Sequence, residues 1–409
     1  MDRIRVSVAP LGLSALCLFL AVACTESSQP TGKPSRPQSS ATGTADGTST
    51  ARPEPERTKR SAGPRAGSPA VIVADMTRKQ RIGQVIMTGA DSTGIDQPTY
   101  DAITSYHVGN VMLTGRSELG VTETAAGVRT LKDEVSQSST AGVPLYVATD
   151  QEGGLVQVLR GPGFTSLPSG LDQGRMTPRA LRTAAERWGG ELRDAGVNVN
   201  LAPVMDTVPS AAVAPRNKPI GAFDRQYGYT VARVTSRGLA FARGMGDAGV
   251  APVVKHFPGL GLVTANTDVS SGVTDRTTTR RDPYLEPFAA AVKDDQPFMM
   301  MSTAYYAKID PDNPAAFSSI IIGGILRERL GFDGIVISDD LSNATQVARW
   351  TPGQRAVKFV AAGGDMVLGV DPAQAPAMAR ALLRRAKSDA AFDRLIDKAA
   401  VRIVAAKKA

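Results

Sequence analysis

The sequence predicts an α/β protein built as a single TIM-type (β/α)8 barrel, and three observations lead to this prediction. Eight apolar runs follow one another at fairly regular intervals after residue 70. They are apolar throughout, which is typical of parallel strands that are buried on both faces. The segments between them mostly have the periodicity of amphipathic helices. Eight such strand and helix units in about 340 residues fit a (β/α)8 barrel with some long loops.

We expect one barrel strand in each apolar run, at 84–89, 109–115, 144–150, 199–206, 251–257, 297–304, 334–340 and 365–370. Helices are expected at 180–195, 231–245, 285–292 and 320–330, with a capped first helix at 78–84. The alternative is a doubly wound open sheet with a nucleotide site. No G-x-G-x-x-G or P-loop motif follows an expected strand, so the barrel is favoured. We expect no second, sandwich-type domain after it.

The first residues have the layout of a signal peptide. Arg3 and Arg5 precede an apolar stretch at 6–23 that ends in small residues. Cys24 follows directly, which resembles the lipobox of bacterial lipoproteins, where this cysteine is lipidated. The resemblance implies a lipid anchor on the outer face of the bacterial cell membrane. Plain secretion is one alternative, and a membrane-spanning anchor is another, since a run of about 18 residues lies at the lower limit for spanning.

After the leader at 1–23, residues 24–69 are rich in Ser, Thr, Pro and Gly and hold almost no large apolar side chains. Such a segment cannot bury enough surface to offset the entropy that it would lose on ordering, so we expect a disordered tether. The barrel is then expected to span residues 70–409.

Charge and metal-ligating residues exclude several functions. The net charge is +8, and residues 1–70 already hold 9 Lys/Arg against 5 Asp/Glu, so the barrel is not expected to bind nucleic acid. Cys17 lies within the leader, and Cys24 is the only other cysteine. With two histidines in the chain and no H-x-x-H spacing, no metal site is expected. No G-x-S-x-G motif is present, which argues against serine-hydrolase chemistry.

Polar residues stand at the expected carboxyl ends of the strands, where (β/α)8 barrels carry their sites. Asp339 closes an apolar run, and a carboxylate held this rigidly suits a nucleophile. Asp150 precedes Gly153 and Gly154, which allow the backbone to come close to a ligand. His107 precedes a strand instead and is expected to be structural. The polar residues at the strand ends are Asp150, Asp206, Lys255, His256, Ser302, Asp339 and Asp340.

Six motifs occur in order between residues 76 and 370. They are IGQVIM from Ile82, DQEGG from Asp150, GFTSLPS from Gly163, NLAPVMD from Asn200, KHFPG from Lys255 and GFDGIVISDDL from Gly331. With them the segment resembles the N-terminal barrel domain of glycoside hydrolase family 3, in its bacterial β-N-acetylhexosaminidase branch. The resemblance implies a retaining two-step mechanism that needs no cofactor. We expect a monomer that acts on the amino-sugar glycan of the cell wall.

The resemblance also implies residue roles. Asp339 matches the nucleophile that forms the glycosyl-enzyme intermediate. Lys255, His256 and Asp150 match positions that bind the sugar hydroxyls in the first subsite, and we expect Asp206 to join them. Charged hydrogen-bonding groups around one carboxylate are also what binding and cleavage of a sugar require chemically.

The loop after the KHFPG motif departs from the family pattern. In this branch the loop continues with His-Gly-Asp-Thr and later Asp-Ser-His, whose last residue is the general acid/base, supported by the Asp before it. Here the two segments read Leu260-Gly261-Leu262-Val263 and Asn266-Thr267-Asp268. The family's acid/base pair is therefore absent.

Arginines that hold the substrate in this branch are also missing. Leu155 and Val158 stand in the places of two of them, and Arg160 is expected to reach in from two residues further on. The family's Arg-Ser-Phe segment is reduced to Gly221-Ala222-Phe223, with Arg225 nearby to compensate.

Two hypotheses follow. In the first, Asp268 is the acid/base, because glycosidases commonly pair a carboxylic acid with a nucleophilic carboxylate about 5 to 5.5 Å away; this hypothesis predicts an acidic pH optimum. In the second, the barrel has lost catalysis and binds wall glycan without turnover. The intact segments around Asp339 and Lys255 favour the enzyme.

Overall fold

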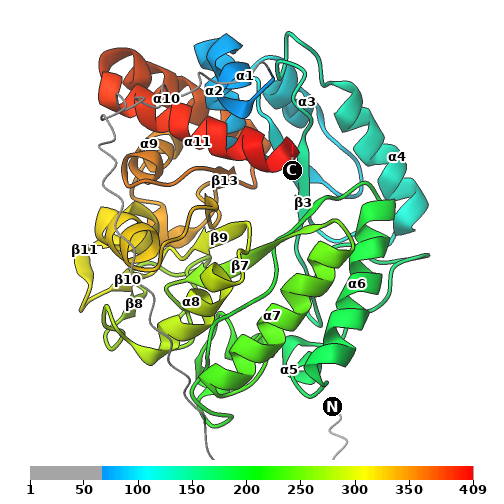
Figure 1. Cartoon of the computed structure of the whole chain (residues 1–409), viewed down its shortest axis with the longest axis vertical. Helices are drawn as coiled ribbons and strands as arrows, with labels where there is room; N and C mark the ends of the chain where they lie inside the picture. Colours follow the sequence, from blue (N-terminus) through cyan, green and yellow to red (C-terminus); the bar gives the residue numbers. More distant parts are fainter. Residues whose placement is uncertain (1–66, 409) are drawn as a thin grey trace, which may run out of the picture. The chain divides into compact units, whose positions relative to one another are not determined.

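The computed structural model describes residues 67–408 and contains the predicted barrel. Eight parallel strands pair in the order β12-β9-β7-β6-β3-β2-β1-β13 (Figure 1). An isolated bridge between Ile337 and Met366 brings the two ends of this sheet together. The strands are β1 (Ile86–Asp91), β2 (Asn110–Thr114), β3 (Tyr146–Thr149), β6 (Val199–Asn200), β7 (Ala251–Phe257), β9 (Phe298–Met301), β12 (Ile335–Ser338) and β13 (Val367–Gly369).

Each strand lies in or overlaps one of the eight apolar runs, so the predicted (β/α)8 barrel is confirmed. Neighbouring strands pair in parallel register, and the first strand pairs with the last through Ile86 and Val367. A doubly wound open sheet is thereby excluded, because its edge strands would not meet.

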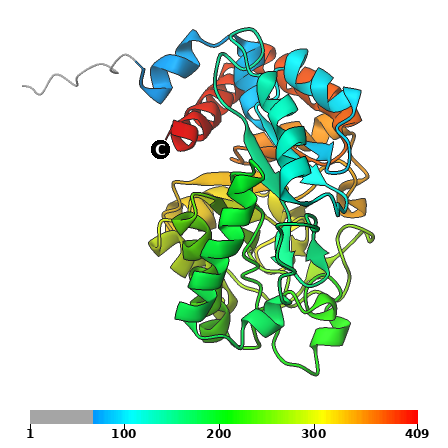
Figure 2. The ribbon, with the colours of Figure 1, turned by 90° about the vertical axis from the view of Figure 1, so that its right-hand side faces the viewer.

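Helices surround the barrel in the intervals between the strands (Figures 1 and 2). Where the sequence predicted helices at 180–195, 231–245 and 285–292, the structure has α6, α7 and α8. The α-helices are α1 (Pro69–Asp75), α2 (Arg78–Gln84), α3 (Gln97–Thr104), α4 (Gly120–Asp133), α5 (Gly170–Gln173), α6 (Pro178–Asp194), α7 (Val231–Asp247), α8 (Glu286–Lys293), α9 (Pro352–Ala361), α10 (Ala375–Ser388) and α11 (Ala390–Lys408).

Local sequence explains where these helices begin and which face they bury. Thr77 caps α2 in a reciprocal capping box with Gln80, and Thr177 accepts a hydrogen bond from the Ala180 N–H at the start of α6. Helix α6 buries Trp188 and the apolar residues on the same side, and the Trp188 ring lies 6.3 Å from the ring of Phe241 on α7. Apolar side chains at helical spacing thus pack α6 against its neighbour α7.

Two features of the fold are not evident from the sequence pattern. The predicted helix at 320–330 forms, but it has π-type hydrogen bonding over Ile320–Arg329. The chain also forms a small three-stranded sheet separate from the barrel sheet. Its strands are β8 (Thr274–Asp275), β10 (Tyr305–Tyr306) and β11 (Asp310–Pro314).

The last helix closes the floor of the barrel. Helix α11 packs against α1, α2 and α10 (Figures 1 and 2). Near its end, the buried Lys407 amino group donates hydrogen bonds to Gln84 Oε1 (2.9 Å) and to the Gly109 carbonyl oxygen (2.8 Å). Burial lowers the pKa of Lys407 well below its usual range. The chain end is therefore built into the bottom of the barrel.

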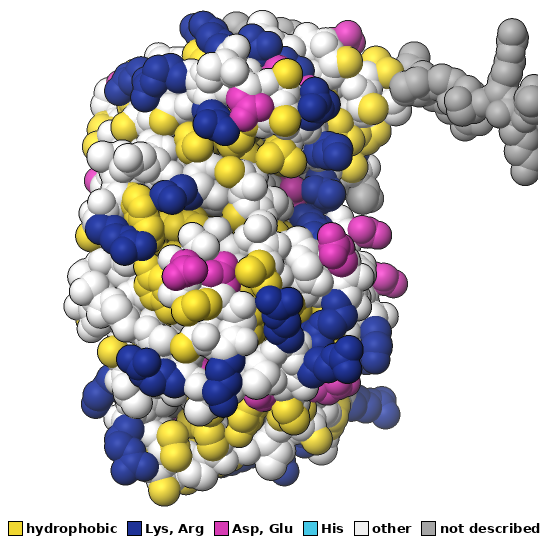
Figure 3. Space-filling view, turned by 90° about the vertical axis from the view of Figure 1, so that its left-hand side faces the viewer, with side chains coloured by type: hydrophobic (Ala, Val, Ile, Leu, Met, Phe, Trp, Pro, Cys, Tyr) yellow, Lys and Arg dark blue, Asp and Glu magenta, His cyan; other side chains and the backbone are white. Residues whose placement is uncertain are grey.

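The signal peptide predicted at 1–23, with Cys24 and nearly all of the tether at 24–69, lies outside the described residues. Within residues 67–408, no helix is both long and apolar enough to cross a membrane. On the face shown in Figure 3, Lys and Arg side chains are spread among apolar and acidic ones.

Candidate active site

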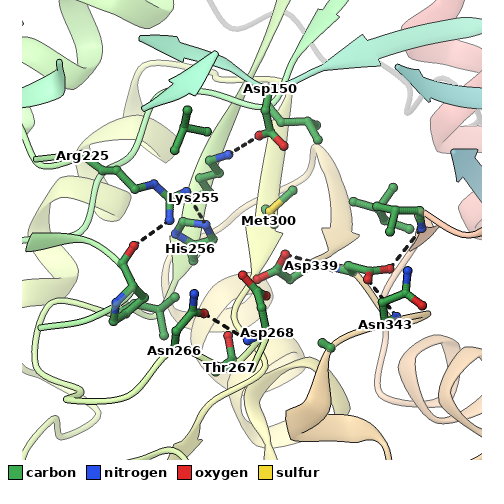
Figure 4. Close-up of a pocket in the computed structure, with 18 of the residues that line it drawn as sticks. Asp150, Arg225, Lys255, His256, Asn266, Thr267, Asp268, Met300, Asp339 and Asn343 are labelled. Atoms are coloured by element: carbon green, nitrogen blue, oxygen red, sulfur yellow. Dashed lines mark hydrogen bonds and ion pairs between the residues drawn. The ribbon is translucent and has the colours of Figure 1, made fainter. Parts of the chain in front are cut away.

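A pocket of about 410 Å³ lies at the carboxyl ends of the barrel strands. Apolar side chains from several strand ends, such as Met112, Met300 and Leu368, form part of its lining. Charged side chains surround Met300 in the pocket (Figure 4). The polar residues in the lining are Asp150, Arg225, Lys255, His256, Asn266, Thr267, Asp268, Asp339, Asp340 and Asn343.

Lys255, near the end of β7, is the centre of a buried charge network. Its amino group donates a hydrogen bond to Asp150 Oδ1 (2.6 Å) and lies 2.6 Å from Glu152 Oε1. Glu152, on β4 (Gln151–Gly153), also accepts two hydrogen bonds from the Arg225 guanidinium, at 2.8 and 2.7 Å. Two cations and two carboxylates are thus interlocked beside the pocket.

These charges keep one another ionised. Burial alone would raise the pKa of Glu152, but Arg225 and Lys255 outweigh it and lower this pKa to about 2. Burial likewise opposes the charge of Lys255, but Asp150 and Glu152 together raise its pKa. Lys255 therefore offers a fixed positive charge to a ligand hydroxyl at any physiological pH.

His256 follows Lys255, and Asp206 orients its imidazole ring from the side away from the pocket. The His256 Nδ1 atom lies 2.7 Å from Asp206 Oδ2, while Asp206 Oδ1 accepts hydrogen bonds from the backbone N–H groups of His256 (3.3 Å) and Leu260 (2.7 Å). Asp206 is fully buried and does not line the pocket. It therefore acts on a ligand only through the orientation of the imidazole, whose Nε2 atom lies 3.4 Å from an Arg225 nitrogen.

Asp339 directly follows β12 and faces the pocket. Its Oδ1 atom accepts a hydrogen bond from the Asp340 N–H (2.9 Å). Burial, together with the negative charge of Asp268, raises the pKa of Asp339 to about 6 against the opposing charges of His256 and Lys255. Asp339 is therefore ionised, as a nucleophile must be, only above about pH 6.

Asp340 also borders the pocket, but its carboxylate is engaged by backbone N–H groups. Its carboxylate accepts hydrogen bonds from the N–H groups of Ser342, Asn343 and Val370, at 2.8, 2.8 and 3.1 Å. These bonds fix the turn that follows the strand. Asp340 thus stabilises the loop beside Asp339.

Asp268 approaches from the loop after β7. Its side chain is exposed, and in Figure 4 its carboxylate and that of Asp339 point toward one another. Its backbone N–H donates a hydrogen bond to Asn266 Oδ1 (3.0 Å). Leu260, earlier in this loop, is buried and lines the pocket. Two carboxylates thus face the same space across the pocket.

Arg160 is not brought to the pocket. Its guanidinium donates hydrogen bonds to the carbonyl oxygens of Gly154 (3.0 Å) and Gln157 (3.3 Å) in its own loop. Arg225 instead is the arginine that borders the pocket. His107 lies outside the lining, with its Nδ1 atom 3.0 Å from the Ser139 carbonyl oxygen.

Glu152 is a site residue that the sequence did not single out. The motif that begins at Asp150 contains it, but nothing in the local pattern shows that it would meet Arg225, which lies 73 residues further along. No group of three or more His, Cys, Asp or Glu side chains within residues 67–408 is arranged to hold a metal ion.

A parallel (β/α)8 barrel whose mouth holds two facing carboxylates beside fixed hydrogen-bonding charges has the site of a glycosidase. Comparison with known families agrees. The model of the glycosyl hydrolase family 3 N-terminal domain matches residues 77–406. The chain therefore belongs to glycosyl hydrolase family 3.

The chain is also similar to individual hexosaminidases. A crystal structure of a β-N-acetylhexosaminidase from Beutenbergia cavernae is 50% identical, with a TM-score of 0.81, and the match covers 82% of this chain and all of that one. The family 3 β-N-acetylglucosaminidase of Paenibacillus is 30% identical, with a TM-score of 0.72 over 82% of this chain and 64% of that one. The β-hexosaminidase LpqI of Mycobacterium tuberculosis is 28% identical over 97% of this chain and 96% of its own length.

The raised pKa of Asp339 predicts a pH-dependent effect of Asp339→Asn on stability. The folded state holds this proton up to a pH of about 6, against an ordinary value of 3.8, so ionisation costs folding free energy. The cost is absent below about pH 4, grows as the pH rises through 6 and is complete above it. Asparagine keeps the acceptor for the Asp340 N–H but removes the charge.

We therefore expect Asp339→Asn to raise the free energy of unfolding by about 1 to 3 kcal/mol at pH 7.5 and by much less at pH 4. Denaturant unfolding of both proteins at the two pH values measures this difference. An equal effect at both pH values would contradict the assignment of the raised pKa to Asp339.

Proposed function

We propose that this protein is a retaining glycoside hydrolase that removes β-linked N-acetylhexosamine from cell-wall glycan or muropeptide fragments. The facing carboxylates of Asp339 and Asp268 in one pocket carry the proposal (Figure 4). Relatives named as β-hexosaminidases and β-N-acetylhexosaminidases support the choice of sugar.

In the first step, Asp339 forms a bond to the anomeric carbon while the glycosidic C–O bond breaks. The Asp340 N–H donates a hydrogen bond to Oδ1 of Asp339. No described residue donates a hydrogen bond to Oδ2 of Asp339, so Oδ2 is the attacking atom. Asp268 gives its proton to the departing oxygen. The products of this step are the free aglycone and a glycosyl ester on Asp339.

In the second step, water attacks the anomeric carbon and the ester bond to Asp339 breaks. Asp268, now ionised, takes the proton from the water. Asp339 returns as a carboxylate and the sugar leaves with its original configuration. Asp268 thus acts first as an acid and then as a base.

In this proposal, the residues of the charge network bind the sugar. Lys255, Asp150 and His256 offer donors and acceptors to the hydroxyl groups, and their own hydrogen bonds fix their directions. Pre-oriented groups lose little entropy when they bind, so they align the anomeric carbon with Asp339 at low cost.

The role of Asp339 predicts the loss of a covalent intermediate. With 2,4-dinitrophenyl N-acetyl-β-glucosaminide, we expect a burst of dinitrophenol from the wild type and none from Asp339→Ala, whose turnover falls at least about 10³-fold. Mass spectrometry of the intact protein during turnover detects the ester, and proteolytic peptides locate it. Saturable binding of glycan by the wild type with neither burst nor turnover would show a binding protein instead.

The role of Asp268 predicts a dependence on the leaving group. Asp268→Asn cannot protonate the departing oxygen, so cleavage of a methyl or phenyl glycoside falls by about 10² to 10⁴-fold. Release of dinitrophenol needs no acid, so glycosylation by this substrate is nearly unchanged, and added azide rescues the slow second step. Equal rates for wild type and Asp268→Asn on the phenyl glycoside would exclude this role.

We further propose that Cys24 is lipidated and holds the protein on the outer face of the bacterial membrane, which would place it beside wall glycan. The layout of residues 1–24 supports this proposal.

Labelling of cells with a clickable palmitate analogue tests the anchor. We expect label on the wild type and release of Cys24→Ser into the medium, because serine lacks the thiol that carries the lipid and the acyl chains supply the membrane affinity. Wild-type protein found unlabelled in the medium would indicate plain secretion, and a membrane-bound Cys24→Ser would indicate a spanning anchor.

A further inference from the structure

The loop that carries Asp268 is fixed at its start by one buried amide side chain. Asn217 donates hydrogen bonds from Nδ2 to the carbonyl oxygens of Leu260 and Val263, both at 2.7 Å. Its Oδ1 atom accepts hydrogen bonds from the N–H groups of Ile220 (3.2 Å) and Gly221 (2.7 Å). The first turn of the loop is thereby tied to the segment that leads to Arg225.

A second buried amide, Gln346, fixes the other end of the loop. Gln346 Oε1 accepts a hydrogen bond from the Val273 N–H (3.0 Å), and Nε2 donates to the Val273 carbonyl oxygen (2.9 Å). The Gln346 side chain therefore pairs with Val273 as a neighbouring strand would.

The backbone around Gln346 contacts Asp268 itself. The Thr345 N–H donates a hydrogen bond to the Asp268 carbonyl oxygen (3.0 Å), and the Gln346 N–H donates to the Thr267 carbonyl oxygen (3.1 Å). Gln346 thus holds the loop at Val273 by its side chain and at Thr267 by its backbone.

The segment that holds the loop also continues from the nucleophile. Gln346 lies seven residues after Asp339, and the hydrogen bonds of Asp340 fix the turn between them. The Asp268 side chain is exposed, so its direction depends mainly on the backbone that carries it. The position of Asp268 relative to Asp339 therefore depends on the hydrogen bonds that Gln346 makes.

We propose that Gln346 is a positioning residue for the reaction, which aims Asp268 at the glycosidic oxygen while Asp339 is held by the same segment. This inference rests on the proposed function of Asp268. A productive proton transfer tolerates displacements of only about 0.5 Å, so a loosened loop loses proton transfer before it loses the fold.

Gln346→Met tests the proposal, because methionine keeps the volume of the side chain and removes both of its hydrogen bonds. Gln80→Met is the matched control. Gln80 is also buried, with Nε2 donating to the Gln137 carbonyl oxygen (2.8 Å) and Oε1 accepting from the Thr77 N–H (3.0 Å), but it lies on α2 outside the pocket lining.

Burst rates and kcat/KM are measured with phenyl and 2,4-dinitrophenyl N-acetyl-β-glucosaminides, together with the melting temperature. For Gln346→Met we expect a loss of about tenfold or more on the phenyl glycoside, with the dinitrophenol burst rate within about twofold of wild type. Gln80→Met should lower the melting temperature comparably without favouring either substrate. In the Asp268→Asn background, Gln346→Met should cause no further loss on the phenyl glycoside.

Two outcomes would overturn the proposal, and they are distinguishable. If Asp268→Asn depends on the leaving group but Gln346→Met slows both substrates equally, Gln346 is merely structural and the function of Asp268 stands. If Asp268→Asn itself shows no such dependence, Asp268 is not the acid and Gln346 has no carboxylate to position. Since Gln346→Met could also weaken folding, Gln346→Asn, which shortens the same amide, should show the same substrate bias.

Discussion

The rest of the site depends on how the buried charge of Lys255 is compensated. Its side chain is only 3% exposed, and that of Glu152 only 6%. Removing either would leave an uncompensated buried charge, which is costly. Because Lys255 lies on β7, Glu152 on β4 and Arg225 after the turn at Gly221–Phe223, this ion network joins three separate segments around the barrel mouth. Because His256 is the next residue after Lys255, this ion network also helps to fix the position of His256.

The same network limits what the pocket can hold. Both cations in its lining, Arg225 and Lys255, are already engaged by carboxylates. Asp268, Asp339 and Asp340 add further negative charge. An anionic ligand such as a phosphate would meet repulsion there, whereas a neutral ligand rich in hydroxyl groups finds donors and acceptors already oriented. The electrostatics of the pocket therefore suit a sugar better than a nucleotide.

Sequence reasoning found the parts of the molecule that depend on short-range pattern. The apolar runs located the barrel strands because burial on both faces requires continuous apolar sequence. Asp150, Lys255, His256 and Asp339 were found because they stand where those runs end. Glu152 and Gln346 were missed because their partners, Arg225 and Val273, are each 73 residues away in the chain. Arg160 was expected in the pocket, but nearby carbonyl groups satisfy its guanidinium within its own loop.

Contacts between the first and the last segments of the barrel domain close the barrel. Strand β1 pairs with β13, and Lys407 reaches Gln84 across 323 residues of sequence. During synthesis these contacts cannot form until almost the whole barrel has left the ribosome, and contacts between distant residues form slowly. The nascent chain consequently stays open for most of its translation. An export route that threads an unfolded chain across a membrane would gain from this delay, and the export signal proposed in the first residues fits such a route.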